Sequence, residues 1–450
     1  VFYDWIINMR LIGGNISDTP VKEIADGSAF NVGGAVAVAT APLLVEYGAP
    51  ARLEATVPTV ANYKGMKNHC KSIWKIKDNY YGFLFRDSGD SNKAYFQLLT
   101  IDPATGVPTA STKVDISANH ASGNYPMAGV TMASASTTAT LVLYTVDSSA
   151  GGGHTATHNI SDCTVTFSTG ALSSITGQTD AFDITTLQGS AFHGMIKMSS
   201  QHVAVFESAN GGATLVTAKG CKVAATRAVH AGTDLSGAVV GNTSGVGVVG
   251  AYNEVGDDDT GFVVAGTSGS SIQRAWKLSI NTSTNAITEV GTATIPGSTT
   301  YTTYASCTGA TQNIGDDLYF QAVLKQANYI DTSSGTPVTQ VLPEPHLVLT
   351  TVVAHADGAA DMVVLDNNRY VSIGHIGGNS GPDLIMSGFL YEHGVHLDYA
   401  LGDTGTGHDS EAAVCIFGLM ASSTSATILT VIYTSDADSG NLRYYTVTIS

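Results

Sequence analysis

Histidines gather in the C-terminal part of the sequence, and the imidazole ring is a common ligand of metal ions. They are His375, His393, His396 and His408. His393 and His396, with His408 as a third ligand, have the residue type that a zinc ion binds. Positions three apart on a β-strand point to opposite faces, however, unless Gly394 introduces a bend. The spacing therefore favours separate histidines over a zinc site.

The acidic run Asp257, Asp258 and Asp259, in the segment GDDDTG, is a second candidate metal site. Calcium prefers carboxylate and carbonyl oxygens as ligands. Three adjacent carboxylates cannot all converge on one ion, and no EF-hand pattern surrounds them. We interpret the run as a solvated hairpin tip and expect no cofactor, with calcium at these three residues as the alternative.

Acidic turns recur between the strand-like segments. Ser88, Asp90, Asn92 and Tyr95 follow the spacing Ser-x-Asp-x-Gly-x-Thr-Trp, with Asn in place of Gly and Tyr in place of Trp. This pattern resembles the Asp-box turn of sialidase-type propellers, and part of it recurs at 436–440. In that family the turn is structural. The resemblance therefore implies a fold and no activity.

Residues for glycoside cleavage by a sialidase-type enzyme are not grouped in the sequence. Such catalysis needs an arginine cluster that binds a carboxylate, together with a Tyr–Glu nucleophile pair. The seven arginines are scattered along the chain. The sequence also contains no GxSxG, P-loop or dinucleotide-binding motif. We assign no catalytic residue, and this pattern favours a non-enzymatic role.

Composition indicates the kind of element that positions these residues. Of the 450 residues, 49 are glycine, 43% are hydrophobic and 13% are charged. Threonine and valine are frequent, and both favour β-strands, whereas the Leu, Glu and Lys of long amphipathic helices are scarce. The formal net charge of −17 argues against a nucleic-acid partner. No apolar run of about 18 residues exists, so we predict no membrane span.

Strand-like runs that end in polar turns recur along the chain. They begin at Tyr80, Thr140, His202, Val246, Asp317, Arg369 and Thr427. Their separations of 60, 62, 44, 71, 52 and 58 residues suit four-stranded propeller blades with loops of variable length. The runs are apolar on both faces, as expected for inner strands packed between neighbouring sheets. In the fourth unit the run from Val246 is followed by FVVAG, then by RAWKLSINTSTN and AITEVGTATI.

One repeat unit divides into four strands, at 72–77, 80–87, 93–102 and 107–116. The turn PATG separates the last two, and NTSTN stands in for it in the fourth unit. The last unit supplies only three strands, at 412–421, 427–436 and 441–450. The missing outer strand is expected from 34–47 or 51–60, which would cover the open edge of 441–450.

These patterns predict an all-β fold, a β-propeller of about seven four-stranded blades whose ring is closed by an N-terminal strand. We expect an N-terminal arm at residues 1–33 and the propeller at 34–450, with the closing strand within 34–60.

The N-terminal arm is apolar enough to need a partner. Its large apolar residues are Phe2, Tyr3, Trp5, Ile6, Ile7, Leu11 and Ile12. A free segment of this composition would expose a hydrophobic patch to water. We therefore predict that these seven residues form a protein-binding site, with the covering of one end of the chain's own ring as the alternative.

The chain as a whole is acidic, β-structured, rich in Thr, Ser, Gly and Ala, and built from divergent repeats. In these respects it resembles the tail-appendage and decoration proteins of bacteriophages. The resemblance implies a non-enzymatic structural or adhesive module of a virion or surface appendage, located in the virion or outside the cell. Its expected partners are other appendage subunits and a host surface glycan or protein. Two alternatives stay open, a secreted carbohydrate-binding propeller and a propeller glycosidase or lyase acting at the mouth of the central channel.

The five cysteines are isolated from one another, at Cys70, Cys163, Cys221, Cys307 and Cys415. Their odd number and the lack of a CxxC pair fit neither a complete disulfide framework nor a zinc knuckle. Each lies in or beside a strand-like run, so we expect buried free thiols.

Overall fold

A computed structural model of the chain describes 23 segments, and every structural statement below is confined to them. They are residues 45–47, 51–52, 73–87, 90–91, 93–118, 124–147, 154–187, 193–208, 214–223, 233–240, 248–252, 260–266, 273–294, 310–315, 317–323, 326–342, 359–366, 369–375, 383–392, 395–407, 417–421, 428–435 and 441–449. Residues 1–33 lie outside them, so the predicted arm and its seven apolar residues are not placed.

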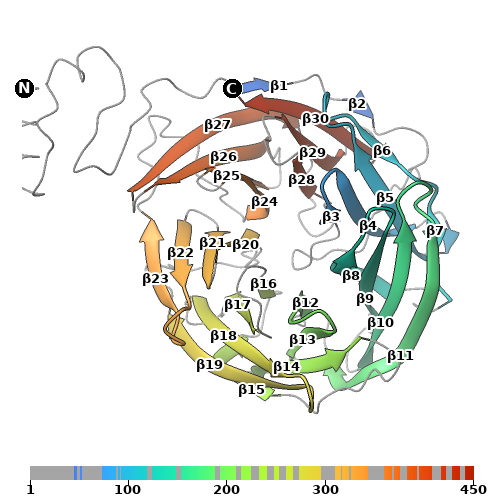
Figure 1. Cartoon of the computed structure of the whole chain (residues 1–450), viewed down its shortest axis with the longest axis vertical. Helices are drawn as coiled ribbons and strands as arrows, with labels where there is room; N and C mark the ends of the chain where they lie inside the picture. Colours follow the sequence, from blue (N-terminus) through green and yellow to red (C-terminus); the bar gives the residue numbers. More distant parts are fainter. Residues whose placement is uncertain are drawn as a thin grey trace, which may run out of the picture.

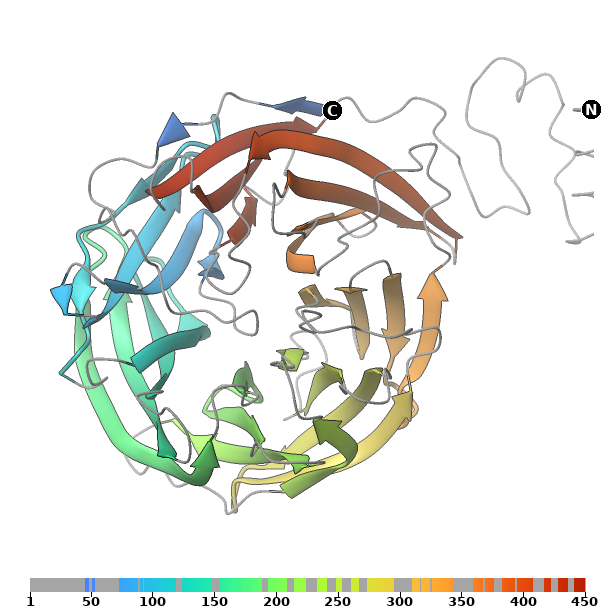
Figure 2. The ribbon, with the colours of Figure 1, turned by 180° about the vertical axis from the view of Figure 1, so that it is seen from behind.

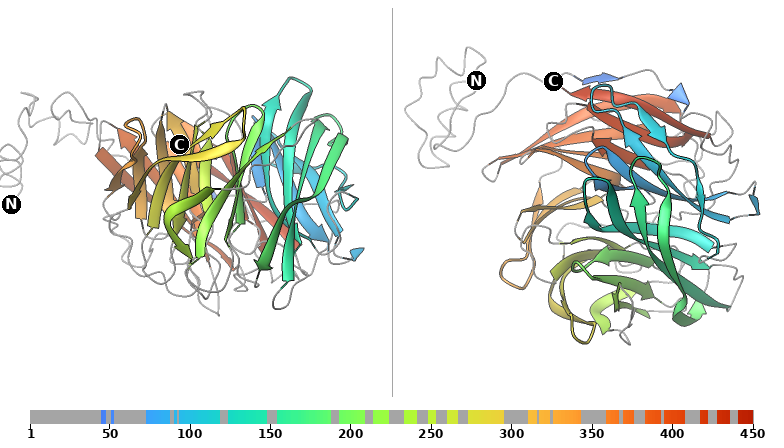
Figure 3. Two further views of the ribbon diagram at one scale, coloured as in Figure 1. Left: turned by 90° about the horizontal axis from the view of Figure 1, so that it is seen from below. Right: turned by 45° about the vertical axis from the view of Figure 1, so that its right-hand side comes forward.

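The described elements are all β-strands, and they pair into antiparallel sheets, as the composition predicted. Seen down the shortest axis, the sheets are arranged one after another around a common centre (Figure 1), and the same order is visible from behind (Figure 2). In side view the strands run between the two broad faces of the molecule (Figure 3). The fold is thus propeller-like.

Within the described residues there are seven sheets, and consecutive strands pair in each. The first contains β3 (Ile73–Lys77), β4 (Tyr80–Asp87), β5 (Lys93–Ile101), β6 (Pro108–Ala110) and β7 (Val114–Asp115). The second contains β8 (Asn124–Ser134), β9 (Thr138–Asp147), β10 (His154–Thr166) and β11 (Leu172–Leu187). The third contains β12 (His193–Lys197), β13 (His202–Ser208), β14 (Thr214–Lys222) and β15 (Thr233–Val240).

The next three sheets repeat this order. The fourth contains β16 (Val248–Tyr252), β17 (Thr260–Gly266), β18 (Gln273–Asn281) and β19 (Ala286–Thr294). The fifth contains β20 (Ala310–Gly315), β21 (Leu318–Val323), β22 (Gln326–Asp331) and β23 (Val338–Leu342). The sixth contains β24 (Ala359–Asp366), β25 (Arg369–His375), β26 (Asp383–Glu392) and β27 (Val395–Gly407).

The last sheet combines the two ends of the described chain. It contains β28 (Phe417–Ala421), β29 (Ile428–Ser435) and β30 (Asn441–Ile449), together with β1 (Val45–Tyr47) and β2 (Ala51–Arg52). Val45 pairs with Ile449, and Ala51 pairs with Tyr444, so both N-terminal strands lie along the edge of β30. These strands fall within 34–47 and 51–60, the two segments that the sequence predicts for the outer strand of the last unit.

The fourth repeat unit has the strand order that the sequence predicted. The run from Val246 corresponds to β16, the first strand of the fourth sheet, and the FVVAG segment that follows it corresponds to β17, the second. With β17 in this place, the second strands begin at Tyr80, Thr138, His202, Thr260, Leu318, Arg369 and Ile428. The successive differences become 58, 64, 58, 58, 51 and 59 residues, a more regular repeat.

The first sheet has a hydrophobic cluster on each face. On one face Ile73, Phe83, Phe85 and Leu99 pack with Ile432 of the last sheet. The other face packs against the second sheet through the side chains of Trp74, Leu84, Ala94, Phe96, Leu98, Leu141, Leu143, Cys163 and Val165. Burial of such side chains is the main source of stability in a fold of this kind.

Two glycines make room for Trp74 on the second of these faces. A Cβ atom on Gly82 would lie 2.4 Å from Cζ2 of Trp74, and one on Gly129 would lie 2.2 Å from its Cη2. Gly82 belongs to β4 and Gly129 to β8 of the second sheet. The indole ring therefore occupies a space between two sheets that is open only because positions 82 and 129 carry no side chain.

A five-residue turn joins the third and fourth strands in four of the described sheets. It occupies residues 102–106, 166–170, 281–285 and 331–335. The fifth residue of each turn has a positive φ, between 62° and 84°, and these residues are Gly106, Gly170, Asn285 and Gly335. Glycine and asparagine adopt this left-handed conformation most readily. The predicted equivalence of NTSTN and PATG agrees with this geometry.

Hydrogen bonds within the turns of the first and fourth sheets explain their residue types. The amide of Gly106 donates to the carbonyl of Asp102 at 2.8 Å, and the amide of Asn285 donates to that of Asn281 at 2.7 Å. Oδ1 of Asp102 accepts the amides of residues 104 and 105, and these two hydrogen bonds lower the pKa of its carboxyl group. Oδ1 of Asn281 accepts two amides in the same way. Three of the four turns therefore start with Asp or Asn, the fourth starts with Thr166, and all four end with Gly or Asn.

Candidate functional site

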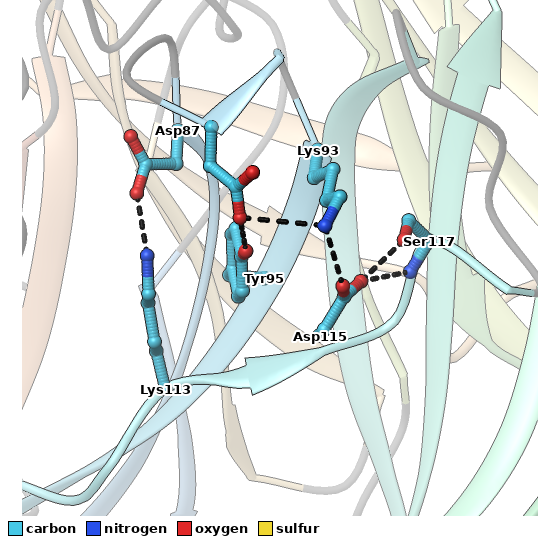
Figure 4. Close-up of polar contacts among 7 residues, drawn as sticks. Asp87, Lys93, Tyr95, Lys113, Asp115 and Ser117 are labelled. Carbon is cyan, nitrogen blue, oxygen red and sulfur yellow. Dashed lines mark hydrogen bonds and ion pairs between the residues drawn. The ribbon is translucent and has the colours of Figure 1, made fainter.

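A group of acids and lysines lies at one end of the first sheet (Figure 4). β4 ends at Asp87 and β5 begins at Lys93, so the hairpin places both at this end. The short strand β7 pairs with β5, with Asp115 opposite Tyr95. Three separate segments thus bring acids and lysines together. We call Asp87, Asp90, Lys93, Tyr95, Lys113, Asp115 and Ser117 the charged cluster.

Asp87 is the buried member of the charged cluster. Its side chain is 5% exposed, and Oδ2 lies 2.6 Å from Nζ of Lys113. Nζ of Lys113 also lies 4.2 Å from the centre of the Tyr95 ring, a cation–π arrangement. A buried carboxylate needs a partner of opposite charge, and Lys113 supplies it from the outer part of the sheet.

Asp90 accepts a short hydrogen bond from the hydroxyl of Tyr95 and lies 3.4 Å from Nζ of Lys93. The Tyr95 hydrogen bond, with Lys93 beside it, holds the pKa of the Asp90 carboxyl below its usual value. Burial and the same hydrogen bond raise the pKa of the Tyr95 hydroxyl. At neutral pH the pair is therefore a carboxylate that accepts from a neutral phenol.

Asp115 completes the charged cluster on the outer strand. Its Oδ2 lies 3.3 Å from Nζ of Lys93, and its Oδ1 accepts hydrogen bonds from the hydroxyl and the amide of Ser117. Burial would raise the pKa of Asp115, but the Ser117 and Lys93 interactions outweigh it and lower the pKa. The hydrogen bond to Asp115, with Asp90 nearby, raises the pKa of Lys93. These shifts keep the acids ionised and Lys93 protonated, so the arrangement holds fixed charges and ties β7 to the hairpin.

A second polar group lies between the third and fourth sheets. His202 is 2% exposed, and its Nδ1 lies 2.8 Å from Oγ of Ser199, while its Nε2 lies 3.1 Å from Oδ1 of Asn285. Both ring nitrogens are therefore engaged, one within the third sheet and one with the turn of the fourth. The arrangement orients the imidazole and joins two sheets.

The Asp-box-like pattern is placed only in part. Asp90 and Tyr95 are in direct contact, as described above, whereas Ser88, Asn92 and the segment 436–440 lie outside the described residues. A contact between the acid and the aromatic residue of the pattern is consistent with a structural turn. The sequence signal was the five-residue spacing between Asp90 and Tyr95.

The predicted metal-binding residues are not brought together by the described part of the chain. Asp257, Asp258, Asp259, His393 and His408 lie outside it. His375 and His396 are in β25 and β27. Among the described residues, no group of three or more His, Cys, Asp or Glu side chains has the geometry to hold a metal ion.

Five residues of the charged cluster had no sequence signal: Asp87, Lys93, Lys113, Asp115 and Ser117. Lys113 and Asp115 lie in the polar fourth strand predicted at 107–116, which looks like an ordinary solvent-exposed edge. Their partners are set by the register of β7 against β5, in which Val114 lies opposite Phe96. Only this register brings Lys113 to Asp87, 26 residues earlier in the chain.

Two of the five cysteines are described, and both are buried free thiols, as expected. Burial, with Asp162 nearby, raises the pKa of the Cys163 thiol to about 12. A thiol of this kind is unreactive at neutral pH. Cys70, Cys307 and Cys415 lie outside the described residues. In the described part of the chain, no helix has the length and apolar character needed to cross a membrane.

Comparisons with known proteins give similarities of structure alone. No family model matches the chain, and no curated protein matches its sequence. A prolyl endopeptidase structure superposes with a TM-score of 0.44 and 10% identity, covering 85% of this chain and 47% of its own. This chain thus spans about half the length of that protein.

Two further structures cover most of both chains. An α-L-arabinofuranosidase from Fusarium graminearum has a TM-score of 0.42 and 7% identity, over 90% of this chain and 98% of its own. The N-terminal domain of Nup159 has a TM-score of 0.39 and 7% identity, over 90% and 96%. These values assign no activity to this chain.

Proposed function

We propose that the chain is a non-enzymatic structural or adhesive module of a virion or other surface appendage, built as a closed seven-bladed β-propeller. In this proposal each described sheet is one blade, and the N-terminal arm docks onto a neighbouring subunit. The expected environment is a virion or the outside of a cell, and a host surface glycan or protein is the expected contact of the adhesive form.

The observation that carries the proposal is that lysine side chains of one sheet make hydrogen bonds and an ion pair with the next sheet. Nζ of Lys77 in the first sheet donates to the carbonyl oxygen of Ser136 in the second at 3.0 Å. Nζ of Lys277 in the fourth sheet lies 2.9 Å from Oδ1 of Asp317 and donates to the carbonyl of Thr332 at 2.8 Å, both in the fifth. Satisfied polar networks of this kind rigidify a fold, which suits a module that transmits or withstands force.

The closed ring is supported by contacts between the first strands of consecutive sheets. β3, β8, β12, β16, β20, β24 and β28 contact one another in this order, and β28 also contacts β3. The pairing of β1 and β2 with β30 adds outer strands to the last sheet. A ring of this form leaves no open face at the junction of first and last blades.

The docking role of residues 1–33 is tested by deleting them. We expect the full chain to self-associate through its seven apolar arm residues, whose burial contributes roughly 10 kcal/mol before ordering costs. The chain 34–450 should be monomeric by light scattering and should keep its melting temperature. The matched control replaces Trp5, Ile6 and Ile7 with serine in the full-length chain and should also be monomeric.

Two outcomes would contradict the docking role. If the chain 34–450 unfolds, the arm belongs to the propeller. If it associates as the full chain does, the arm is not the contact. Binding of the monomeric chain 34–450 to a glycan array would then favour the alternative, a secreted carbohydrate-binding propeller, whereas turnover of a polysaccharide would favour a glycosidase or lyase.

A further inference from the structure

The five-residue turns also make contacts between sheets. Those of the second, fourth and fifth sheets pack on the sheet before them in the chain. A Cβ atom on Gly220, in β14 of the third sheet, would lie 2.0 Å from the carbonyl oxygen of Asn285 in the fourth. A Cβ atom on Gly291, in β19 of the fourth sheet, would lie 2.5 Å from the carbonyl oxygen of Gly335 in the fifth. In both cases the strand that contacts the turn carries a glycine at the point of contact with the turn backbone.

The turn of the second sheet docks in the same direction. A Cβ atom on Gly170 would lie 2.3 Å from Cβ of Ser111 and 3.2 Å from Cβ of Leu98, both in the first sheet. The contact is thus made by the left-handed residue itself. Three turns, from the second, fourth and fifth sheets, therefore contact the sheet before them in the chain. We call them docking turns.

The turn of the first sheet has no preceding sheet in the chain, and it docks on the last one. A Cβ atom on Gly106 would lie 2.6 Å from Cγ2 of Ile428 and 3.1 Å from Cγ2 of Thr446. The hydroxyl of Thr430 donates a short hydrogen bond to the carbonyl oxygen of Gly106, across 324 residues. Thr430 is fully buried. We call residues 102–106 the closing turn.

The N-terminal strands make a different kind of contact. β1 and β2 pair with β30, so they extend the last sheet at its outer edge. Hydrogen bonds within one sheet do not join that sheet to its neighbour. In the described residues, the joint between the last and first sheets includes the contact of β28 with β3, the aromatic cluster around Phe83 and Ile432, and the closing turn.

We infer that the closing turn is the device that holds the first sheet on the last, and that β1 and β2 protect the edge of β30. The inference rests on the closed ring of the proposed function. It follows from the shared geometry, since the joint uses the same turn, the same left-handed residue and the same direction as the other docking turns. An exposed edge such as that of β30 requires separate protection.

The test compares Gly106→Ala with Gly335→Ala in the full chain, by native-state hydrogen exchange of the strand amides. Both substitutions place a side chain at a positive φ, 73° and 84°. At Gly335, however, the new Cβ would meet only Cγ1 of Val290, at 3.7 Å, so this variant carries the backbone strain without a clash. We expect about tenfold faster exchange in β3 and β28 for Gly106→Ala than for Gly335→Ala.

A second variant separates the closing turn from the edge strands. Deleting residues 1–62 removes β1 and β2, and we expect loss of protection in β30 while β3 and β28 stay protected. Gly170→Ala is the positive control, with faster exchange at the joint of the first and second sheets. Equal exchange in β3 and β28 for Gly106→Ala and Gly335→Ala would overturn the inference, as would loss of protection in β3 and β28 on deletion alone.

Failure of the closed ring itself gives a different result. In that case β3 and β28 would exchange rapidly in the unmodified chain, before any substitution. Protected strands in the unmodified chain, with no difference between the two glycine variants, would leave the ring intact and reject only the role of the closing turn.

Discussion

The two faces of the first sheet are packed in different ways. Toward the last sheet the core is aromatic, with the rings of Phe83 and Phe85 stacked at 4.9 Å and those of Phe85 and Tyr95 at 5.7 Å. Toward the second sheet one large ring, that of Trp74, lies over two glycines. The first face is filled by aromatic side chains, whereas the second has a largely aliphatic cluster in which two glycines make room for one large ring.

This difference makes opposite demands on substitution. A loss of volume on the aromatic face leaves a cavity, because the surrounding side chains relax only in part. A gain of volume at Gly82 or Gly129 on the tryptophan face overlaps the indole ring. The same sheet therefore needs aromatic volume around Phe83 on one side and glycine beside Trp74 on the other. The predictions below test this contrast in order of expected effect.

The largest effect is expected on the aromatic face. Phe83 is fully buried, so Phe83→Ala should lower the free energy of unfolding by about 4 kcal/mol. Urea denaturation followed by circular dichroism measures the change. Phe83→Leu, which retains most of the volume, should cost about 1 kcal/mol. Equal losses for the two variants would mean that the volume of this face does not matter.

On the tryptophan face we expect Gly129→Val to lower the free energy of unfolding by about 3 kcal/mol, because the new side chain overlaps the indole ring. The double variant Gly129→Val/Trp74→Ala should lose less than the sum of the two single changes, since each relieves the other. If the losses in the free energy of unfolding simply add in the same denaturation experiment, Gly129 does not serve to make room for Trp74.

The buried ion pair of the charged cluster should give a smaller effect. Lys113→Met leaves Asp87 buried without this cation and should cost about 2 kcal/mol, less than for a fully buried pair because the Lys113 side chain is 32% exposed. Adding Asp87→Asn should restore part of the loss. A double variant less stable than Lys113→Met alone would contradict the pairing.

The smallest effect is a dependence on pH. Asp90 and Asp115 have lowered pKa values in the folded chain, so their stabilising contribution is present above the unfolded value and is lost as pH falls through the folded pKa. Lys93 has a raised pKa, so its contribution is present below the unfolded value and is lost as pH rises through the folded one. The melting temperature of Asp115→Asn should therefore fall less than that of the unmodified chain between pH 5 and pH 2, a range that brackets the usual Asp pKa of roughly 3.9. Parallel curves would remove Asp115 from this linkage.

The sequence predicts the strands well where they are apolar on both faces, as in 80–87 and 93–101. It also divides the fourth unit in the observed order, with the run at Val246 as β16 and FVVAG as β17. The turn equivalence of PATG and NTSTN is recognisable, since the need for a left-handed residue limits the choice to Gly or Asn. Contacts set by register are not recognisable. Lys113 meets Asp87 only when β7 pairs with β5, and Gly106 meets Thr430 only when the first sheet packs on the last.

The direction of docking has a consequence for the order in which the chain can fold during synthesis. The turns of the second, fourth and fifth sheets find their receiving strands already made, so each new sheet can settle on the previous one as it leaves the ribosome. The first sheet cannot. Its turn at Gly106 and its aromatic face wait for Thr430 and Ile432, more than 300 residues later. At about 5 to 20 residues per second, this face stays unpaired for roughly 15 seconds to one minute. That interval is when the nascent chain is most exposed to aggregation, and when a chaperone that shields aromatic surfaces would improve its yield most.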